Sequence, residues 1–217
     1  QDAYALETLT RAQNATKNGK FKREIAPVTV KGRKGDTIVD QDELPRTAMP
    51  DKIPTLRPAF SKDGTVTAAN ASAISDGAAA MVLMRESEAK KRGLTPIAKI
   101  VSSSSHAHEP EYFTTAPVPA MKKALEKAGW SIEDVDLWEV NEAFAVVPMI
   151  AMKELGISHD KLNVHGGACA MGHPIGASGA RVIITLLAAM EDRGVKKGMA
   201  SLCIGGGEGI AMALERY

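Results

Sequence analysis

A glycine-rich loop that runs into an apolar helix constrains this chain most. Residues 164–179 are rich in glycine and contain one proline, and residues 182–190 after them are apolar without interruption. Glycine frees the backbone, so this loop can turn sharply into a buried helix. His173 precedes Pro174, which biases the histidine away from helical dihedrals and places it on the loop. There it faces the positive end of the following helix, where polarised carbonyl oxygens are favoured.

Two further motifs carry polar side chains at the ends of apolar strands. Residues 201–209 form a short apolar strand that delivers Cys203 to a glycine-rich turn. Residues 138–144 form a strand that ends in Asn141 and Glu142 and then opens a helix. Open α/β sheets usually build their sites at such strand ends. Each motif therefore presents a potentially reactive side chain where a site is expected.

Strands alternate with helices from Pro96 onward, which predicts an α/β fold, and a closing hairpin makes the sheet mixed. The expected strands are 97–101, 135–140, 162–164 and the hairpin 199–204 with 210–214; the expected helices are 117–128, 142–155 and 176–191. Upstream we expect a helix within 1–17, an edge strand at 24–30, a surface excursion at 43–58 and a buried strand at 78–84. Residues 144–152 and 182–190 are apolar nearly all round, which predicts helices buried on all sides.

Composition excludes several classes of partner. The chain has 27 basic and 26 acidic residues and a net charge of +1, which argues against nucleic acid or a charged membrane surface. No apolar stretch is long enough to cross a bilayer, and no signal peptide is visible. Two distant cysteines indicate reduced thiols and a cytoplasmic protein. Organellar targeting is the alternative, because the chain starts at Gln1 and we expect a fragment.

Two histidines have a spacing that suits metal ligands on a strand. They are His106 and His108, and no third ligand stands beside them in the sequence. We therefore expect no metal site.

Three motifs together resemble the thiolase family, coenzyme A-dependent enzymes that make or cleave 3-ketoacyl thioesters. They are NEAF at 141–144, GHPIG at 172–176 and CIGGG at 203–207, in the family's order and at compatible spacing. The resemblance implies a layered α-β-α-β-α fold with mixed sheets, of which this chain would hold the second half plus part of the loop domain. Residues 1–74 would belong to the loop domain that covers the active site and holds coenzyme A. Residues 75–95 would return to the N-terminal half, and residues 96–217 would form the C-terminal half.

The same resemblance implies catalytic roles. A thiolase removes a proton beside a thioester carbonyl and lets the enolate attack an acyl group held on a second cysteine. Cys203 would be the acid/base, with its pKa lowered by backbone dipoles and a neighbouring histidine. His173 would activate the nucleophile and donate its Nε2–H to a thioester oxygen. Asn141 would hold a water as the second donor, and the Gly205 N–H would serve the other oxyanion hole.

Four residues match positions that contact substrate in the family. Ala71 and Ser72 lie in the segment along the pantetheine arm, although Ser72 read alone would be a turn cap. Arg46 matches a residue near the adenine end, with a one-residue gap nearby. Phe113 matches a wall of the acyl pocket and does not by itself rank acyl chain lengths. Coenzyme A enters as a substrate, and no other cofactor is implied.

The family's nucleophilic cysteine matches nothing in this chain. We therefore expect an N-terminal half, as a separate or cleaved chain, to supply it, and a strongly apolar exposed surface where that half would sit. Cys169 lies between two alanines and is interpreted as core. His165 stands where the family commonly has asparagine, which indicates a packing or hydrogen-bond substitution. The family also implies a dimer or a tetramer.

Two functions from different classes follow. The first is an acyl-CoA C-acyltransferase, performing reversible Claisen condensation of acyl-CoA or thiolysis of 3-ketoacyl-CoA. The second is a non-catalytic half that binds coenzyme A esters or a partner subunit. The intact set Asn141, His173 and Cys203 favours the enzyme. A dinucleotide-binding domain is disfavoured because the glycines at 205–207 run into a strand rather than a helix.

Overall fold

A mixed four-stranded sheet is the centre of the computed structural model, which describes all 217 residues. The strands are β3 (Ala98–Ala107), β4 (Leu137–Val140), β5 (Lys197–Ile204) and β6 (Glu208–Arg216), in the order β3-β6-β5-β4. β5 runs parallel to β4 and antiparallel to β6, and β3 is antiparallel to β6. The predicted α/β fold with a mixed sheet and a closing hairpin is confirmed.

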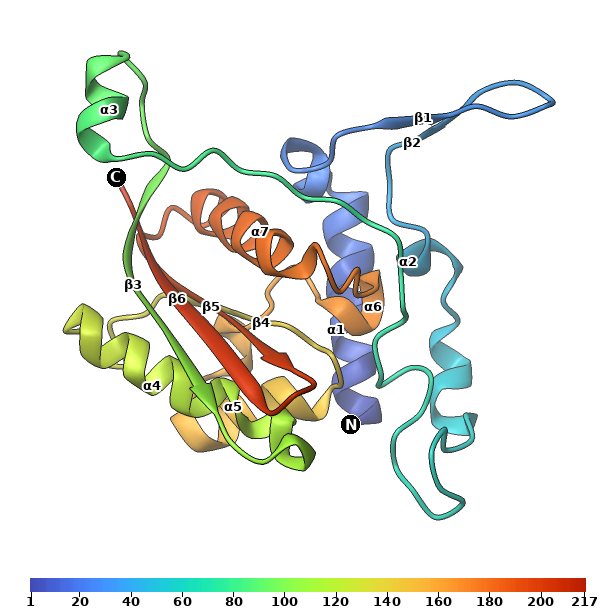
Figure 1. Cartoon of the computed structure of the whole chain (residues 1–217). Helices are drawn as coiled ribbons and strands as arrows, with labels where there is room; N and C mark the ends of the chain where they lie inside the picture. The colour runs from blue at the N-terminus through green and yellow to red at the C-terminus, as the bar shows by residue number, and fades with distance from the viewer.

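Helices cover both faces of this sheet (Figure 1). α4 (Pro117–Ala128) and α5 (Val146–Leu155) lie on one face, and α7 (Ser178–Asp192) lies on the other. Alternate residues of a strand point to opposite faces. In β5, Met199 and Cys203 accordingly pack in the core with α4 and α5, whereas Ala200 packs with α7. The chain thus forms three layers, with helices on both faces of the sheet.

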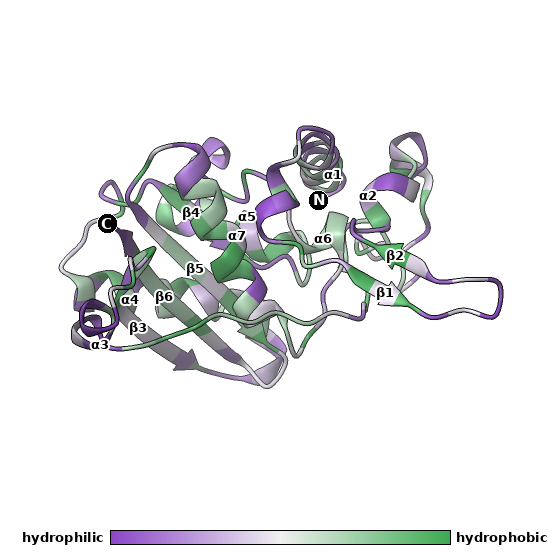
Figure 2. Cartoon of the chain, turned by 90° about the horizontal axis from the view of Figure 1, so that it is seen from above, coloured by the Kyte–Doolittle hydropathy of each residue, from purple (hydrophilic) through white to green (hydrophobic).

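The N-terminal third packs beside the sheet against the glycine-rich loop. It contains α1 (Asp2–Lys17), η1 (Lys20–Arg23), β1 (Val28–Val30), β2 (Thr37–Val39), α2 (Leu44–Thr47) and η2 (Pro50–Thr55). Ala5, Leu9 and Ala12 of α1 share a hydrophobic cluster with Ile53 and with Ala170 of α6 (Ala168–Met171). The β1–β2 hairpin projects away from the rest of the chain, and Figure 2 shows apolar residues on it. Of the strand predicted at 24–30, only the last three residues form a strand, which is β1.

The remaining elements are short. They are α3 (Glu86–Lys91), η3 (Pro110–Thr115) and η4 (His159–Lys161). No helix combines the length and the apolar character that a membrane crossing requires.

The predicted buried strand at 78–84 is wrong. The segment forms no strand, and Val82 and Leu83 are 83% and 66% exposed. Its apolar composition suits a strand, but no strand of this chain lies alongside to complete a ladder. Ile74 and Phe60 are also exposed, at 92% and 77%. Large apolar side chains are therefore exposed on this chain, and whether an N-terminal half covers them stays a prediction.

Three further expectations need correction. Residues 162–164 form only one bridge, between Leu162 and Trp138, because Asn163 adopts φ +47° and leaves the extended conformation. The helix expected from 142 begins at Val146, because the backbone before it bonds to residues 70–72 instead: Ala145 N donates to Asn70 O at 2.7 Å, and Ser72 N donates to Ala143 O at 3.1 Å. α5 and α7 are not buried all round, since each packs one face on the sheet and leaves residues such as Met149 and Ile183 half-buried.

One buried carboxylate joins α1 to the end of β4 and to the glycine-rich loop. Glu142 is fully buried, and its Oε1 accepts hydrogen bonds from Tyr4 Oη at 2.8 Å, Thr8 Oγ1 at 2.8 Å and Asn163 Nδ2 at 2.9 Å. Its Oε2 accepts from Cys169 N at 3.0 Å. The loop passes so close that a Cβ at Gly167 would collide with the carboxylate.

We predict that Glu142→Gln destabilises the chain by about 2–3 kcal/mol, because an amide NH₂ would face donors that then lose their acceptor. Urea unfolding followed by circular dichroism measures this loss. Glu88→Gln is the matched control, since Glu88 pairs only with Arg92 on an exposed helix and should cost about 0.5 kcal/mol or less. Equal losses in the two variants would contradict the assigned role of Glu142.

Candidate active site

The backbone around His173 is fixed by contact with residues 73–75. Gly172 has φ +94°, and a Cβ there would collide with Ser75 Oγ. His173 N donates to Ala73 O at 2.8 Å, and His173 forms a single bridge with Ile74. His173 therefore lies on the loop between α6 and α7, as its position before Pro174 predicted.

The imidazole of His173 has a defined tautomer. Ser178 Oγ donates its one proton to Pro174 O at 3.0 Å, so at 2.6 Å from His173 Nδ1 it accepts the Nδ1–H. On the other side of the ring, Asn141 Nδ2 lies 3.2 Å from Nε2 and donates to it. Nε2 therefore carries a lone pair. The role of His173 as an Nε2–H donor stays a prediction, since Nε2 would gain this proton when it acts as a base.

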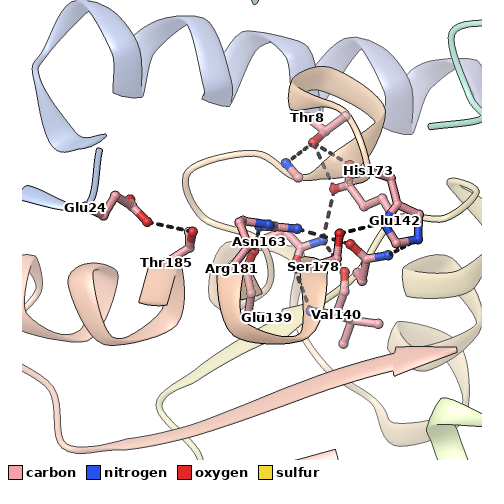
Figure 3. Close-up of polar contacts among 12 residues, drawn as sticks. Thr8, Glu24, Glu139, Val140, Glu142, Asn163, His173, Ser178, Arg181 and Thr185 are labelled. Carbon is pink, nitrogen blue, oxygen red and sulfur yellow. Dashed lines mark hydrogen bonds and ion pairs between the residues drawn. The ribbon is translucent and has the colours of Figure 1, made fainter. Parts of the chain in front are cut away.

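The orientation of the Asn141 amide supports this assignment. Arg181 Nη2 lies 3.1 Å from Asn141 Oδ1, and a guanidinium can only donate. The Asn141 oxygen must then face Arg181, and the NH₂ must face His173. One of the two Nδ2 hydrogens is left for a water or a substrate oxygen. Figure 3 shows His173, Ser178 and Arg181 together at the start of α7.

Burial and a positive charge keep His173 neutral. Partial burial is the main cause that lowers the pKa of His173 from its ordinary value, and the Arg181 charge lowers it further. A neutral imidazole with a lone pair on Nε2 can accept a proton from a thiol that takes the place of the Asn141 donor.

Cys203 lies near Asn141 because β4 and β5 are parallel neighbours. Val140 is paired with Ser201, and Asn141 N donates to Ser201 O at 2.9 Å. Asn141 follows the last residue of β4, and Cys203 is the second-last residue of β5, so both lie at the same end of adjacent parallel strands. The motif residues predicted to share a strand-end setting do so.

The predicted lowering of the Cys203 pKa is wrong in this state. Burial in the apolar core raises the pKa of the Cys203 thiol to about 11, and only a backbone hydrogen bond acts in the opposite direction. Cys203 points into the core that contains α4 and α5, and its Sγ makes no hydrogen bond to a charged group. The apolar contacts outweigh the dipoles that the sequence suggested, so the thiol is neutral near pH 7.

Gly205 presents an open backbone donor. It lies in the turn between β5 and β6, its N–H has no acceptor in the chain, and the space where a Cβ would stand is empty. Gly205 can therefore donate to an incoming oxygen atom without side-chain obstruction.

Three of the four predicted substrate-contacting residues gather around Phe144. Ala71 bridges Phe144, and both the backbone N and the Oγ of Ser72 donate to Ala143 O, at 3.1 and 3.0 Å. The ring of Phe113 meets the ring of Phe144 edge-on at 6.1 Å. The fourth residue, Arg46, lies apart on α2, where it is exposed and its Nε donates to Asp42 O at 3.3 Å.

Sequence reasoning missed Arg181, Ser178 and Phe60. Phe60 packs edge-on against Phe144 at 6.2 Å from 84 positions away in the chain, and no local pattern indicates that contact. Arg181 did leave a signal, because it is the one charged residue between Gly176 and Met190.

A cavity of 380 Å³ lies between α1, α2 and η2, beside the segment that carries Ala71 and Ser72. Apolar side chains line it almost completely, and its wall includes Ala68, Ala69 and Cys169. None of the four predicted catalytic residues lines it. Cys169 packs against the core, and burial raises its thiol pKa well above the ordinary value, which agrees with its interpretation as a core residue.

The other histidines have structural neighbours. His165 is buried, meets Phe21 edge-on and lies 3.7 Å from Asp192, as a packing substitution would. His106 Nδ1 lies 3.1 Å from Lys123 Nζ, and its ring meets that of His108 edge-on. No group of three His, Cys, Asp or Glu residues is arranged to hold a metal ion.

Two family models match almost the whole chain. The model described as "Thiolase, N-terminal domain" matches residues 1–87, and the model described as "Thiolase, C-terminal domain" matches residues 94–216. An acetyl-CoA acetyltransferase of Rhizobium meliloti is 56% identical over 217 residues, covering 100% of this chain and 55% of the relative. The chain thus spans about half the length of such relatives.

Solved structures agree with this similarity. The Bacillus anthracis acetyl-CoA acetyltransferase superimposes with a TM-score of 0.97 at 45% identity, and the match covers 100% of this chain and 55% of that one. The Acat5 thiolase from Ascaris suum, solved in complex with coenzyme A, gives a TM-score of 0.91 at 43% identity with the same coverage.

We predict that iodoacetamide labels Cys203 about 100-fold more slowly than a free thiol near pH 7.5, because a raised pKa leaves little thiolate. The rate should climb as pH rises toward about 11, the pKa of this thiol. The Cys169→Ser variant isolates Cys203 as the one remaining thiol for mass spectrometry. Labelling as fast as that of free cysteine at pH 7.5 would show that Cys203 is ionised.

Proposed function

The chain belongs to the thiolase family, and from this premise we propose that it supplies the acid/base and oxyanion-donor part of an acyl-CoA C-acyltransferase. The reaction is reversible Claisen condensation of two acyl-CoA molecules, or thiolysis of a 3-ketoacyl-CoA. One observation carries the proposal. The hydrogen bond between Asn141 and His173 joins two motifs 32 residues apart, at the sheet edge where β5 delivers Cys203.

His173 fits a sequence of two roles. Its Nε2 lone pair accepts the proton of the acyl-carrying thiol, which the family's N-terminal half would supply. The imidazolium formed in this way holds an Nε2–H, which then donates to a thioester oxygen. One residue thereby activates the nucleophile first and stabilises the developing oxyanion afterwards, with Asn141 as the neighbouring donor.

Cys203 fits the role of proton donor in the cleavage direction. When the bond between the α-carbon and the ketone carbon breaks, the electron pair forms an enolate, and the Cys203 thiol protonates its carbon and becomes a thiolate. The high pKa of Cys203 means that the resting enzyme already holds this proton. In the condensation direction Cys203 first gives its proton to the coenzyme A thiolate that leaves when the nucleophile is acylated, and the Cys203 thiolate then takes a proton from the α-carbon of the second acyl-CoA. The Gly205 N–H serves the other oxyanion hole.

We assign substrate binding mainly to the segment that contains Ala71 and Ser72. Their backbone lies against residues 143–144, next to Asn141, and the apolar cavity opens beside the same segment. We assign Ala71, Ser72 and Phe113 to the pantetheine and acyl part of the site and Arg46 to the adenine end. Coenzyme A and its esters act as substrates, and the proposal needs no other cofactor.

The assembly and the division of the chain are part of the same proposal. Residues 1–74 belong to the loop domain, 75–95 to the N-terminal half and 96–217 to the C-terminal half. An N-terminal half, separate or cleaved, covers the exposed apolar segment at 78–84, and the complete protein is a dimer or a tetramer. We place it in the cytoplasm.

A chimera tests the catalytic assignment. This chain replaces the matching residues of the Rhizobium meliloti relative, and thiolysis of acetoacetyl-CoA is followed by absorbance. We predict that His173→Ala and Cys203→Ser each lower kcat by about 100-fold or more, since each removes a proton-transfer group. Cys169→Ala, the matched control, should stay within about threefold of the parent, as a core substitution away from the chemistry would. If Cys169→Ala abolishes turnover while Cys203→Ser does not, the acid/base is misassigned.

The second candidate function, a non-catalytic half that binds coenzyme A esters, is favoured by the Ser72 segment alone. We predict that Ser72→Ala weakens coenzyme A binding about fivefold in calorimetry, because one hydrogen-bond partner is lost. Ser103→Ala on the exposed edge of β3 should leave the affinity unchanged. Binding that depends on Ser72, together with a chimera that never turns over, would favour this second function.

A further inference from the structure

Arg181 makes two contacts that no motif accounts for. Its side chain is 19% exposed, at the start of α7, and Nη1 donates to Glu139 Oε1 at 3.1 Å while Nη2 donates to Asn141 Oδ1 at 3.1 Å. Glu139 and Asn141 are two residues apart at the end of β4, so their side chains share a face. The planar guanidinium fork spans both of them, as a lysine ammonium could not.

The second contact decides which way the Asn141 amide points. The two ends of an asparagine amide have similar shapes, and rotation about the terminal bond exchanges them. If the amide turned over, Oδ1 would face His173 and would favour a proton on Nε2. Arg181 has no acceptor, so the amide oxygen stays on its side and the NH₂ stays on the histidine side.

The first contact holds Arg181 itself. Glu139 is 2% exposed, and burial raises its pKa to about 8 although the Arg181 charge acts in the opposite direction. With or without its proton, the side chain accepts the hydrogen bond from Arg181 Nη1 at Oε1 and anchors the guanidinium below α7. Burial raises the pKa of two further carboxyl groups, those of Glu24 and Asp42. Both groups lie close enough for the Arg181 charge to act in the opposite direction and lower their pKa values, but the effect of burial is larger. Glu24 is engaged by Thr185 Oγ1 at 2.8 Å, whereas Glu139 is the one carboxylate that pairs directly with Arg181.

The geometry points to Arg181, anchored by Glu139, as a positioning residue that orients the Asn141 amide and thereby keeps a lone pair on His173 Nε2. A continuous line of hydrogen bonds runs from Glu139 through Arg181, Asn141, His173 and Ser178 to Pro174 O. From Arg181 onward every donor points toward Pro174 O, and Arg181 also donates in the other direction to Glu139. The use of the lone pair as a base rests on the proposed function; the tautomer itself does not.

Histidine side-chain ¹⁵N NMR on this chain tests the inference without any activity. His173 signals are identified by their loss in His173→Gln. The wild-type ring should show a protonated Nδ1 and a bare Nε2, and Arg181→Met should give a mixture of tautomers. The pKa of His173 should also rise in Arg181→Met, because a nearby positive charge is removed. Arg193→Met, which removes an exposed arginine bonded to Asp160 O, should change neither.

A second variant separates positioning from folding. Arg181→Met leaves Glu139 buried without a partner, which can unfold the chain, whereas Arg181→Met with Glu139→Leu removes both polar partners together. This double variant should fold and still show mixed tautomers. A folded double variant with the wild-type tautomer would overturn the inference.

Kinetics in the chimera then separate this inference from the proposed function. Arg181→Met should lower kcat about tenfold or more with KM changed less than about threefold, and Arg181→Lys should restore little, because an ammonium lacks the fork. An inactive parent chimera would overturn the proposed function and leave the tautomer result standing. Unchanged kcat in Arg181→Met would overturn the positioning role.

Discussion

The buried carboxylate of Glu142 is the interaction on which the rest of this structure depends. Its hydrogen-bond partners are all neutral: two hydroxyls, one amide and one backbone N–H. A polar side chain in a core is costly unless hydrogen-bond partners surround it, so the segments that supply these donors pack around Glu142. α1, the end of β4 and the loop after Asn163 meet there. Gly167 follows from the same contact, because no side chain fits between the loop and the carboxylate.

The candidate site is built from the two segments that meet at Glu142. Asn141 precedes Glu142 at the end of β4, and the loop that Glu142 anchors continues to His173. The two titratable groups of the site, His173 and Cys203, lie in different environments, and each environment favours the neutral form. His173 is half-buried near a cation and is held neutral, whereas Cys203 is buried among apolar side chains and keeps its proton. The site therefore holds a neutral base, His173, and a neutral acid, Cys203. Such a pair suits a reaction in which one group accepts a proton and the other donates one.

The local sequence pattern was sufficient to predict much of the fold and the positions of the motifs. The bounds of α1 and α4, the closing hairpin and the strand-end settings of Asn141 and Cys203 were predictable, because each follows from periodicity or from glycine and proline within a few residues. Residues 78–84 were not, since apolar composition does not say whether a partner strand exists. The pKa direction of Cys203 depends on α4 and α5 packing over it. The orientation of Asn141 depends on Arg181, 40 positions away.

Exchange of the acetyl methyl protons of acetyl-CoA with D₂O, followed by proton NMR in the chimera, tests the central claim most directly. This exchange isolates the proton transfer that we assign to Cys203, with the enolate oxygen held by His173 and Asn141. We expect exchange in the parent and its loss in Cys203→Ser, while coenzyme A still binds. Exchange that persists in Cys203→Ser would contradict the account, because the acid/base would then lie elsewhere.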